Sequence, residues 1–207
     1  MTESKIRGFP LLRYNEDKSI ISGSIIVDDT DSYDIQIALR GFPNGVPVVY
    51  ETEGRIPRKD DRHTYNSGEL CLTTEPNMEI YLKSMVKTIE DFINFLVVPF
   101  LQNNSYYELK RGYKFDEYTH EPFGSTYETY RDILGVTNIQ LLIRTLEQRL
   151  KIRPNEKCYC QSNIKIKNCS DHSSRYKKFR LLSKERLRKD IILLKTLLNE
   201  LLKLKTR

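Results

Sequence analysis

The sequence predicts an α+β fold in which an antiparallel meander of strands is followed by helices. Residues 19–27 are rich in β-branched side chains, and residues 33–39 alternate apolar and polar side chains, as strands do. From residue 80 onwards, apolar residues instead recur every three or four positions, which is typical of one face of a helix. This change of period divides the chain into a sheet-forming part and a helical part.

The first part of the chain is predicted to form three strands in sequence order. The polar turn 28–32 joins residues 19–27 to residues 33–39, and the glycine- and proline-containing stretch 41–47 precedes a third strand at 48–51. Short connections between consecutive strands favour antiparallel pairing, so we expect a meander.

Four helices are expected to follow, over residues 80–101, 127–134, 139–150 and 175–205. Pro99 should end or kink the first helix, because proline lacks the N–H that a helix interior uses. Gly135 should stop the second helix. Either Thr137 or Asn138 can cap the third helix with a side-chain oxygen.

The composition fits one domain with an appendage, since the chain has 207 residues of which 39% are hydrophobic. The longest apolar run, residues 92–101, is interrupted by Asn94 and Pro99 and is too short to span a membrane. No basic-then-apolar segment opens the chain, so no export signal is expected. We therefore expect a cytoplasmic protein without a membrane partner, whose 4 cysteines are reduced, catalytic or metal-bound.

The net charge of +6 conceals an asymmetry between the two parts of the chain. Residues 1–136 carry 15 Lys and Arg against 22 Asp and Glu, whereas residues 137–207 carry 19 against 6. An acidic domain with a basic tail should meet different partners through its two parts.

One cysteine, Cys71, stands apart from a C-terminal cluster of three. It follows a polar loop that begins at Arg62 and His63, and it lies between Leu70 and Leu72, which can anchor in a core. A thiol becomes a useful nucleophile when neighbours help it to ionise, as Arg62 or His63 could do. A cysteine between leucines is also often a small buried core residue, so a purely structural role stays open.

Attack by a thiol on a carbonyl creates an oxyanion that needs stabilisation. In the loop before Cys71, the candidates are the side-chain amide of Asn66 and free backbone N–H groups near Gly68. The loop therefore offers donors for the chemistry that a thiol nucleophile performs.

The order of elements around Cys71 resembles that of ubiquitin-conjugating enzymes. That family has a proline-rich turn before its third strand, and a His-Pro-Asn motif before a Gly-x-Ile/Leu-Cys-Leu step. The chain matches the turn and the step at Phe42, Pro43, Pro47, Gly68, Leu70, Cys71 and Leu72. His63 and Asn66 correspond in kind to the motif, although the tripeptide itself is absent and the loop is shorter. The resemblance implies a ubiquitin-conjugating (UBC-like) domain over residues 1–150.

A closer resemblance is to the bacterial conjugating-enzyme-like proteins of anti-phage operons that signal with cyclic oligonucleotides (CBASS). It covers about residues 8–172. Its first stretch is Gly54-Arg55-Ile56-Pro57-Arg58, Asp61-Arg62-His63 and Gly68-x-Leu70-Cys71-Leu72, and its second contains His120, Gly124, Tyr127, Tyr130, Leu134 and Gly135. Family members tend to have His-Gly where this chain has His120-Glu121.

This resemblance implies that Cys71 forms a thioester with the C-terminus of a carried protein and passes the acyl group to an amine. The carried protein would be a cGAS-like nucleotidyltransferase or a ubiquitin-like protein, delivered with or without an activating enzyme. Asn66 would stabilise the oxyanion, and Asp60 or Asp61 would take the proton of the incoming amine. His63 would order the loop.

Alternatives to this assignment remain open. His120 would reach the site only if its stretch folds back, and is otherwise structural. A catalytically inactive scaffold would bind the nucleotidyltransferase through its C-terminal tail. A cysteine hydrolase that removes conjugates would need His63 as a base on the Cys71 thiol.

Residues 151–174 contain a second constellation, which predicts a structural zinc site with Cys158, Cys160, Cys169 and His172 as ligands. The spacing resembles the small zinc motif of the bacterial preprotein translocase motor. Gln161 and Asn163 stand where that motif has glycines, and Ser170 stands at its fourth ligand position. His172 is the substitute ligand. The alternative is a degenerate knuckle, meaning a zinc-knuckle motif that no longer binds metal.

Residues 175–207 are predicted to form a basic amphipathic helix. Leucine and isoleucine recur in a heptad-like rhythm, at Leu187, Ile191, Leu194, Leu198 and Leu201. The helix could associate with a second copy or a partner, or it could pack on its own domain. Nucleic-acid binding is not expected, because no base-reading motif accompanies the basic residues.

Overall fold

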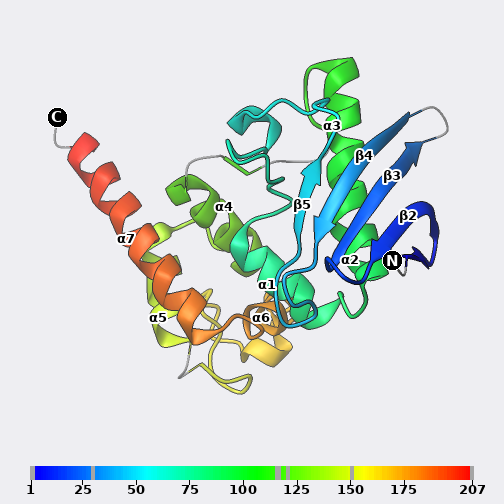
Figure 1. Ribbon diagram of the computed structural model, residues 1–207. Coiled ribbons are helices and arrows are strands. Elements are labelled where there is room, and N and C mark those ends of the chain that lie inside the picture. Colours follow the sequence, from blue (N-terminus) through cyan, green and yellow to red (C-terminus); the bar gives the residue numbers. More distant parts are fainter. Residues whose placement is uncertain (1–2, 29–30, 115–117, 120–121, 150–151, 206–207) are drawn as a thin grey trace. The chain divides into compact units, whose positions relative to one another are not determined.

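The computed structural model describes residues 3–28, 31–114, 118–119, 122–149 and 152–205 (Figure 1). The chain forms two compact units. Unit 1 consists of Met1–Thr73 and Met85–Glu117, and unit 2 consists of Thr74–Ser84 and Tyr118–Arg207. The fold is α+β, with one antiparallel sheet in unit 1 and helices in both units.

The sheet of unit 1 has five strands in the order β1-β2-β3-β4-β5, all antiparallel. The strands are β1 (Glu3–Ile6), β2 (Phe9–Asn15), β3 (Ile20–Asp28), β4 (Asp31–Ala38) and β5 (Val48–Glu51). The three predicted strands and their meander are confirmed as β3, β4 and β5. The sequence pattern does not reveal β1 and β2, because β2 contains a proline and two adjacent leucines instead of an alternating pattern.

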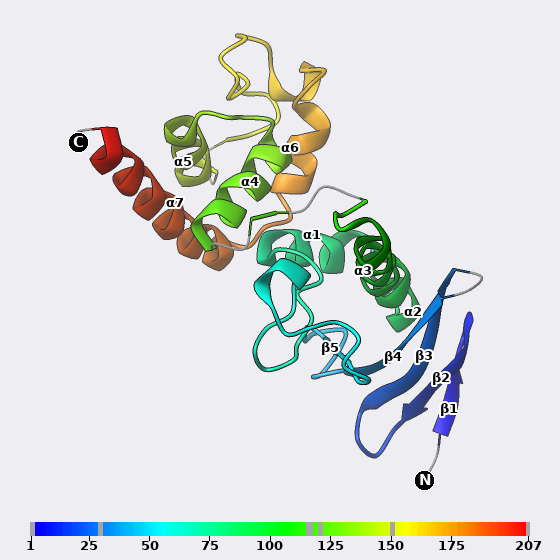
Figure 2. The same cartoon turned by 90° about the horizontal axis from the view of Figure 1, so that it is seen from above.

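One face of this sheet forms the core of unit 1. Alternate residues of β3 and β4 are buried on that face, namely Ile21, Ile25, Val27, Tyr33, Ile35 and Ile37. The helical segment of unit 1 lies along the same face of the sheet (Figure 2). It consists of α2 (Ile89–Phe92), the π-helical turn η2 (Ile93–Val97) and α3 (Val98–Lys110). Burial of these apolar faces holds the sheet against the helices.

The predicted single helix over residues 80–101 is wrong, because the chain forms separate helices there. α1 (Glu75–Ser84) ends before Met85, and a new helix begins at Thr88. The Thr88 hydroxyl accepts the N–H of Asp91 and the Asp91 carboxylate accepts the N–H of Thr88, which forms a capping box. Pro99 does not end the helix either, because it lies in the first turn of α3, directly after the wide π turn.

Unit 2 is helical. It contains α1, α4 (Pro122–Leu134), α5 (Ile139–Gln148), the short 3₁₀ turn η3 (Ile166–Asn168), α6 (Ser173–Phe179) and α7 (Lys184–Lys205). Gly135, at a φ of 69°, follows the end of α4 as predicted. Asn138 caps α5 by accepting the N–H of Leu141. The cysteine cluster shares one hydrophobic core with these helices, so the units cut across the predicted boundaries at 150 and 174.

The predicted single helix over residues 175–205 is also wrong, because α6 and α7 are separate. The Ser183 hydroxyl accepts the N–H of Arg186 and so begins α7 as a capping residue. Leu187 and Leu194 of α7 are buried in the core of unit 2, where α7 contacts α4 and α5. Its last turns leave Leu201 and Leu204 exposed. Within the described part of the chain, no helix has the length and apolar composition needed to cross a membrane.

Candidate functional sites

The loop that carries Cys71 is closed by backbone hydrogen bonds. The 3₁₀ turn η1 (Asp60–Arg62) leads into His63, which adopts a left-handed conformation with a φ of 50°. The N–H of Cys71 then donates to the carbonyl of His63 over 2.8 Å, and the N–H of Leu70 donates to Val49 of β5 over 2.8 Å. The loop is thereby fixed to the edge of the sheet, with Cys71 at its exit.

The Cys71 thiol lies half-buried beside the hydroxyl of Tyr65. The neighbouring Cys71 thiol, followed by partial shielding from water, raises the pKa of Tyr65. The Cys71 Sγ atom also lies 3.9 Å from the carbonyl oxygen of Thr73. The sequence gives no signal for Tyr65 as a thiol neighbour, because a tight turn brings it back to the cysteine.

Three of the backbone N–H groups near Gly68, which were expected to be free, already donate hydrogen bonds. The N–H of Gly68 donates to Tyr65 over 2.8 Å, and those of Leu70 and Cys71 are engaged as described above. Gly68 has a φ of 89°, which a residue with a side chain adopts only with strain. Asn66 is exposed at the tip of this turn. Its side-chain amide remains the candidate donor of the loop.

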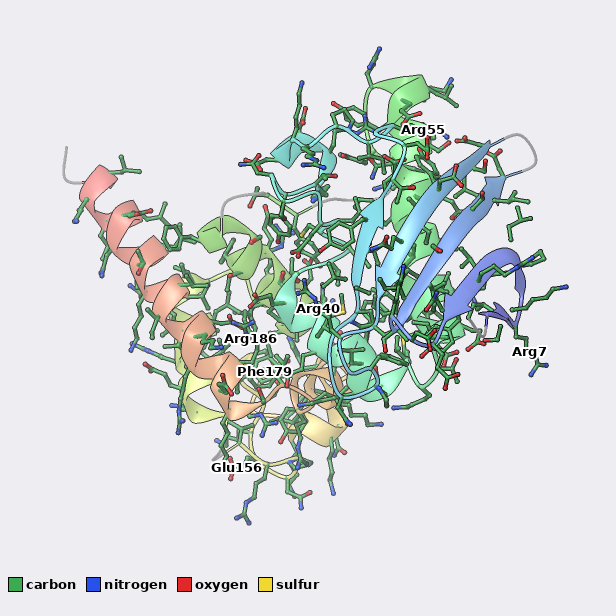
Figure 3. The ribbon with its side chains drawn as sticks, viewed as in Figure 1. Arg7, Arg40, Arg55, Glu156, Phe179 and Arg186 are labelled. Carbon is green, nitrogen blue, oxygen red and sulfur yellow. The ribbon has the colours of Figure 1, made fainter. Side chains whose placement is uncertain are left out.

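Arg62 does not face the thiol, contrary to its predicted role in thiol ionisation. Its guanidinium is buried and donates to Asn104 over 2.9 Å and to Glu108 over 3.3 Å, both on α3. Arg55 also binds Glu108, over 2.7 Å, and lies beside the end of α3 (Figure 3). Two arginines of the loop before Cys71 are therefore held by one carboxylate of α3, which fixes where the loop lies.

The other predicted site residues of this loop lie around its edge. The ring of His63 makes an edge contact with Tyr113, with the ring centroids 5.6 Å apart. The backbone carbonyl of Asp61 accepts a hydrogen bond from the Tyr113 hydroxyl over 2.5 Å. The carboxylates of Asp60 and Asp61 are exposed. His120 lies outside the described residues.

The second candidate site lies in unit 2, where the four predicted ligands come together. The ligand atoms of Cys158, Cys160, Cys169 and His172 all lie within 4.8 Å of one another. The Sγ atoms of Cys160 and Cys169 are 4.0 Å apart, and Nδ1 of His172 is 3.2 Å from Sγ of Cys169. Tetrahedral zinc with Zn–S bonds of about 2.3 Å separates its sulfur ligands by about 3.8 Å. These four residues could hold a metal ion.

A small hairpin builds this cluster. Lys157 and Lys165 form an antiparallel bridge, and the N–H of Cys158 donates to Ile164 over 2.7 Å. At its tip, Gln161 and Asn163 have φ values of 64° and 61°. These are the positions where the resembled motif has glycines, because glycine adopts a left-handed backbone without strain.

The cluster is tied to the end of α4. The Tyr159 hydroxyl donates to the carbonyl of Leu134 over 3.1 Å. The backbone of Gly135 favours the protonated ring of His172 and partly opposes the effect of burial on its pKa. Nδ1 of His172 faces Cys169, so this nitrogen is the one that could bind a metal ion.

Burial shapes the protonation of the cluster. Burial raises the pKa of the Cys158 thiol to about 12, and it lowers the pKa of His172. A bound cation would favour the thiolate that burial disfavours, so metal and proton compete for this sulfur. Ser170 lies outside the cluster, exposed, with its hydroxyl bonded to Asp171. The substitute ligand His172 therefore occupies the fourth position.

Comparisons with models of known protein families, with curated proteins and with solved structures found no match for this chain. Its functional interpretation therefore rests on the residues and their geometry.

Proposed function

We propose that this protein is a conjugating-enzyme-like acyl carrier that forms a thioester on Cys71 with the C-terminus of a partner protein and transfers it to an amine. The observation that carries this proposal is the position of the thiol. Cys71 is half-buried at the exit of a loop that is bonded to the edge of an antiparallel meander, beside the Tyr65 hydroxyl. The resemblance to the ubiquitin-conjugating fold concerns this same step.

The proposed chemistry has two displacements at one carbonyl carbon. The Cys71 thiolate attacks the activated C-terminal carbonyl of the partner, an oxyanion forms, and the activating group leaves with the bonding electron pair. An amine then attacks the thioester carbonyl, loses its proton and expels the Cys71 thiolate. The product is an amide, and the free cysteine is regenerated.

Each residue of the loop has a separate role in the proposed reaction. Tyr65 donates to the thiolate and orients it. Asn66, exposed at the tip of the turn, supplies its amide to the oxyanion. Asp61 accepts the proton of the amine, and His63 orders the loop through its carbonyl bond to Cys71. Water-exposed Asp61 and Asn66 are accessible to a second protein bearing the amine.

The carried protein is proposed to be a cGAS-like nucleotidyltransferase or a ubiquitin-like protein, by the resemblance to CBASS proteins. An activating enzyme, or the partner itself, supplies the activated carbonyl. Conjugation would then prime anti-phage signalling.

The second site is proposed to hold a structural zinc ion. Three sulfurs and one imidazole nitrogen suit zinc, and the spacing between the ligand atoms fits a tetrahedral ion. All four positions are filled by protein, so this ion would stabilise unit 2 and leave the reaction to Cys71.

Intact-mass spectrometry after non-reducing electrophoresis tests the acyl carrier directly. Wild-type protein, Cys71→Ser and Cys71→Ala would each be co-expressed with a cGAS-like nucleotidyltransferase and an activating enzyme. We expect a reducible adduct at the summed mass less water for wild type, a reductant-stable adduct for Cys71→Ser, and none for Cys71→Ala. A stable non-covalent complex in all three, without an adduct, would instead favour an inactive scaffold.

A further inference from the structure

Exposed basic residues lie on the segments of unit 2 that contain and follow the cysteine cluster. We call this group the basic surface, and it comprises Lys165, Lys167, Lys177, Lys178, Arg180 and Lys184. None of these six side chains forms an ion pair with any residue in the described part of the chain. They lie on consecutive segments, namely the end of the hairpin, η3, α6 and the start of α7, and η3 packs against α6.

The positive charge of this region is not compensated locally. Residues 157–184 contain 8 Lys and Arg but only one acidic residue, Asp171, which accepts a hydrogen bond from Ser170. Three thiolates and a zinc ion would add a charge of about −1, which leaves the region strongly positive. Uncompensated like charges repel one another, and an anionic partner relieves this repulsion.

Three acidic residues elsewhere in unit 2 are already engaged. Glu79 pairs with Lys83, and Glu185 pairs with Lys189. Asp190 is buried beside Arg186. These carboxylates therefore do not neutralise the basic surface. In Figure 3, side chains with nitrogen tips project outward from the segment around Glu156.

The composition of the surface distinguishes between two kinds of anionic partner. A specific protein interface has an apolar core inside a polar rim. Over residues 157–184, the described exposed large apolar side chains comprise Ile164 alone, 48% exposed. Contacts to a phosphate backbone need only lysine and arginine. The surface therefore fits a nucleic acid better than an acidic protein.

We infer that unit 2 binds nucleic acid through its phosphate backbone at the basic surface, without reading base sequence. This goes beyond the acyl-carrier function and is independent of Cys71. It also revises the expectation from the sequence that the protein does not bind nucleic acid. That expectation was based on the absence of a base-reading motif. The structure adds that these cations are exposed on consecutive segments and have no ion pair with the residues that the structure describes, which suffices for sequence-independent binding.

Fluorescence anisotropy of the full chain tests this inference. The probes are fluorescein-labelled single-stranded RNA of about 20 nucleotides and duplex DNA of about 20 base pairs, titrated across a series of KCl concentrations. The variant Lys165→Gln/Lys167→Gln/Lys177→Gln/Lys178→Gln removes four cations of the surface. The control Lys5→Gln/Lys18→Gln/Lys59→Gln/Lys110→Gln removes the same charge from unit 1.

We expect wild type to bind with a Kd of about 10⁻⁴ to 10⁻⁶ M at physiological salt. The surface variant should bind at least about 30-fold more weakly at 0.1 M salt, with a shallower salt dependence, because it releases fewer counterions. The control should stay within about 3-fold of wild type. Equal metal content and melting temperature across the proteins would show that folding is intact.

Three results would overturn the inference. The first is that wild-type protein binds neither the RNA probe nor the DNA probe at low salt. Another is an equal loss in the surface variant and the control, which would indicate a general effect of net charge. The third is equally tight binding to labelled polyglutamate of similar length, which would point to an acidic protein partner.

Discussion

The backbone N–H of Cys71 donates to the carbonyl oxygen of His63 over 2.8 Å. These residues are eight positions apart in the sequence, and their hydrogen bond closes the loop between them. Tyr65 is inside this closed loop, which is why its hydroxyl reaches the thiol. The loop is held from outside by Arg62, which binds α3. The following predictions test these connections and those of unit 2.

Tyr65→Phe should slow the alkylation of Cys71 by iodoacetamide by about 3- to 10-fold at neutral pH, because the thiolate loses a hydrogen-bond donor. Peptide mapping by mass spectrometry would follow Cys71 alone. The control Tyr50→Phe removes a hydroxyl that bonds Glu69 over 3.0 Å and should leave the rate unchanged. An unchanged rate in Tyr65→Phe would remove Tyr65 from the proposed chemistry.

Arg62→Ala should lower the free energy of unfolding by about 2–4 kcal/mol, because it leaves the buried side-chain oxygen of Asn104 without its donor and removes one of the two arginines that bind Glu108. Urea denaturation would measure the loss. The matched change Arg40→Ala breaks an exposed pair with Glu69 and should cost below about 1 kcal/mol. Equal losses in the two variants would contradict the anchoring role of Arg62.

Wild-type protein should contain one zinc ion per chain, measured by elemental mass spectrometry. Cys169→Ser should lose the metal and melt at a lower temperature, because the ligands belong to the core of unit 2. Cys71→Ser serves as the matched control and should retain the metal. A melting temperature that does not respond to chelation or added zinc would argue for a degenerate knuckle.

Gln161→Gly should raise the free energy of unfolding by about 0.5–1 kcal/mol, because Gln161 has a φ of 64° and glycine adopts this conformation without strain. The control Lys165→Gly changes a residue with a φ of −62° and should destabilise the protein slightly. Chemical denaturation of the metal-loaded chains compares them. A loss of stability in Gln161→Gly would show that its side chain matters more than its backbone.

Asp190 should make the stability of unit 2 depend on pH. Burial raises the pKa of Asp190, while its bonds to Tyr130 and Arg186 partly oppose the rise. The folded state therefore holds the proton more tightly than the unfolded state. The resulting stabilisation is complete below the unfolded pKa of about 4 and is lost as pH rises through the raised value.

The variant Asp190→Asn cannot titrate at this position and isolates the effect. The free energy of unfolding of wild type minus that of Asp190→Asn should increase as pH falls from 7 towards about 4. Urea denaturation at several pH values measures this difference. A difference that is constant or that decreases on acidification would show that ion pairing with Arg186 outweighs burial.

The local pattern was sufficient to predict several elements. Strands β3, β4 and β5, the stop at Gly135 and the Asn138 cap depend on neighbouring residues, so composition and period reveal them. The cysteine cluster was predictable for the same reason, since its ligands lie within a short stretch. The break at Thr88 was not, because an apolar period continues across it.

The sequence by itself determined the α+β class, the meander and the identity of the four clustered metal-ligand candidates. Tertiary structure decided that Arg62 turns away from the thiol and that Tyr65 turns towards it, because Glu108 of α3 competes for the arginine from 46 positions away. It also decided which lysines have no ion pair among the described residues. Both outcomes depend on residues that folding brings together, so the hydrophobic periodicity of the sequence cannot predict them.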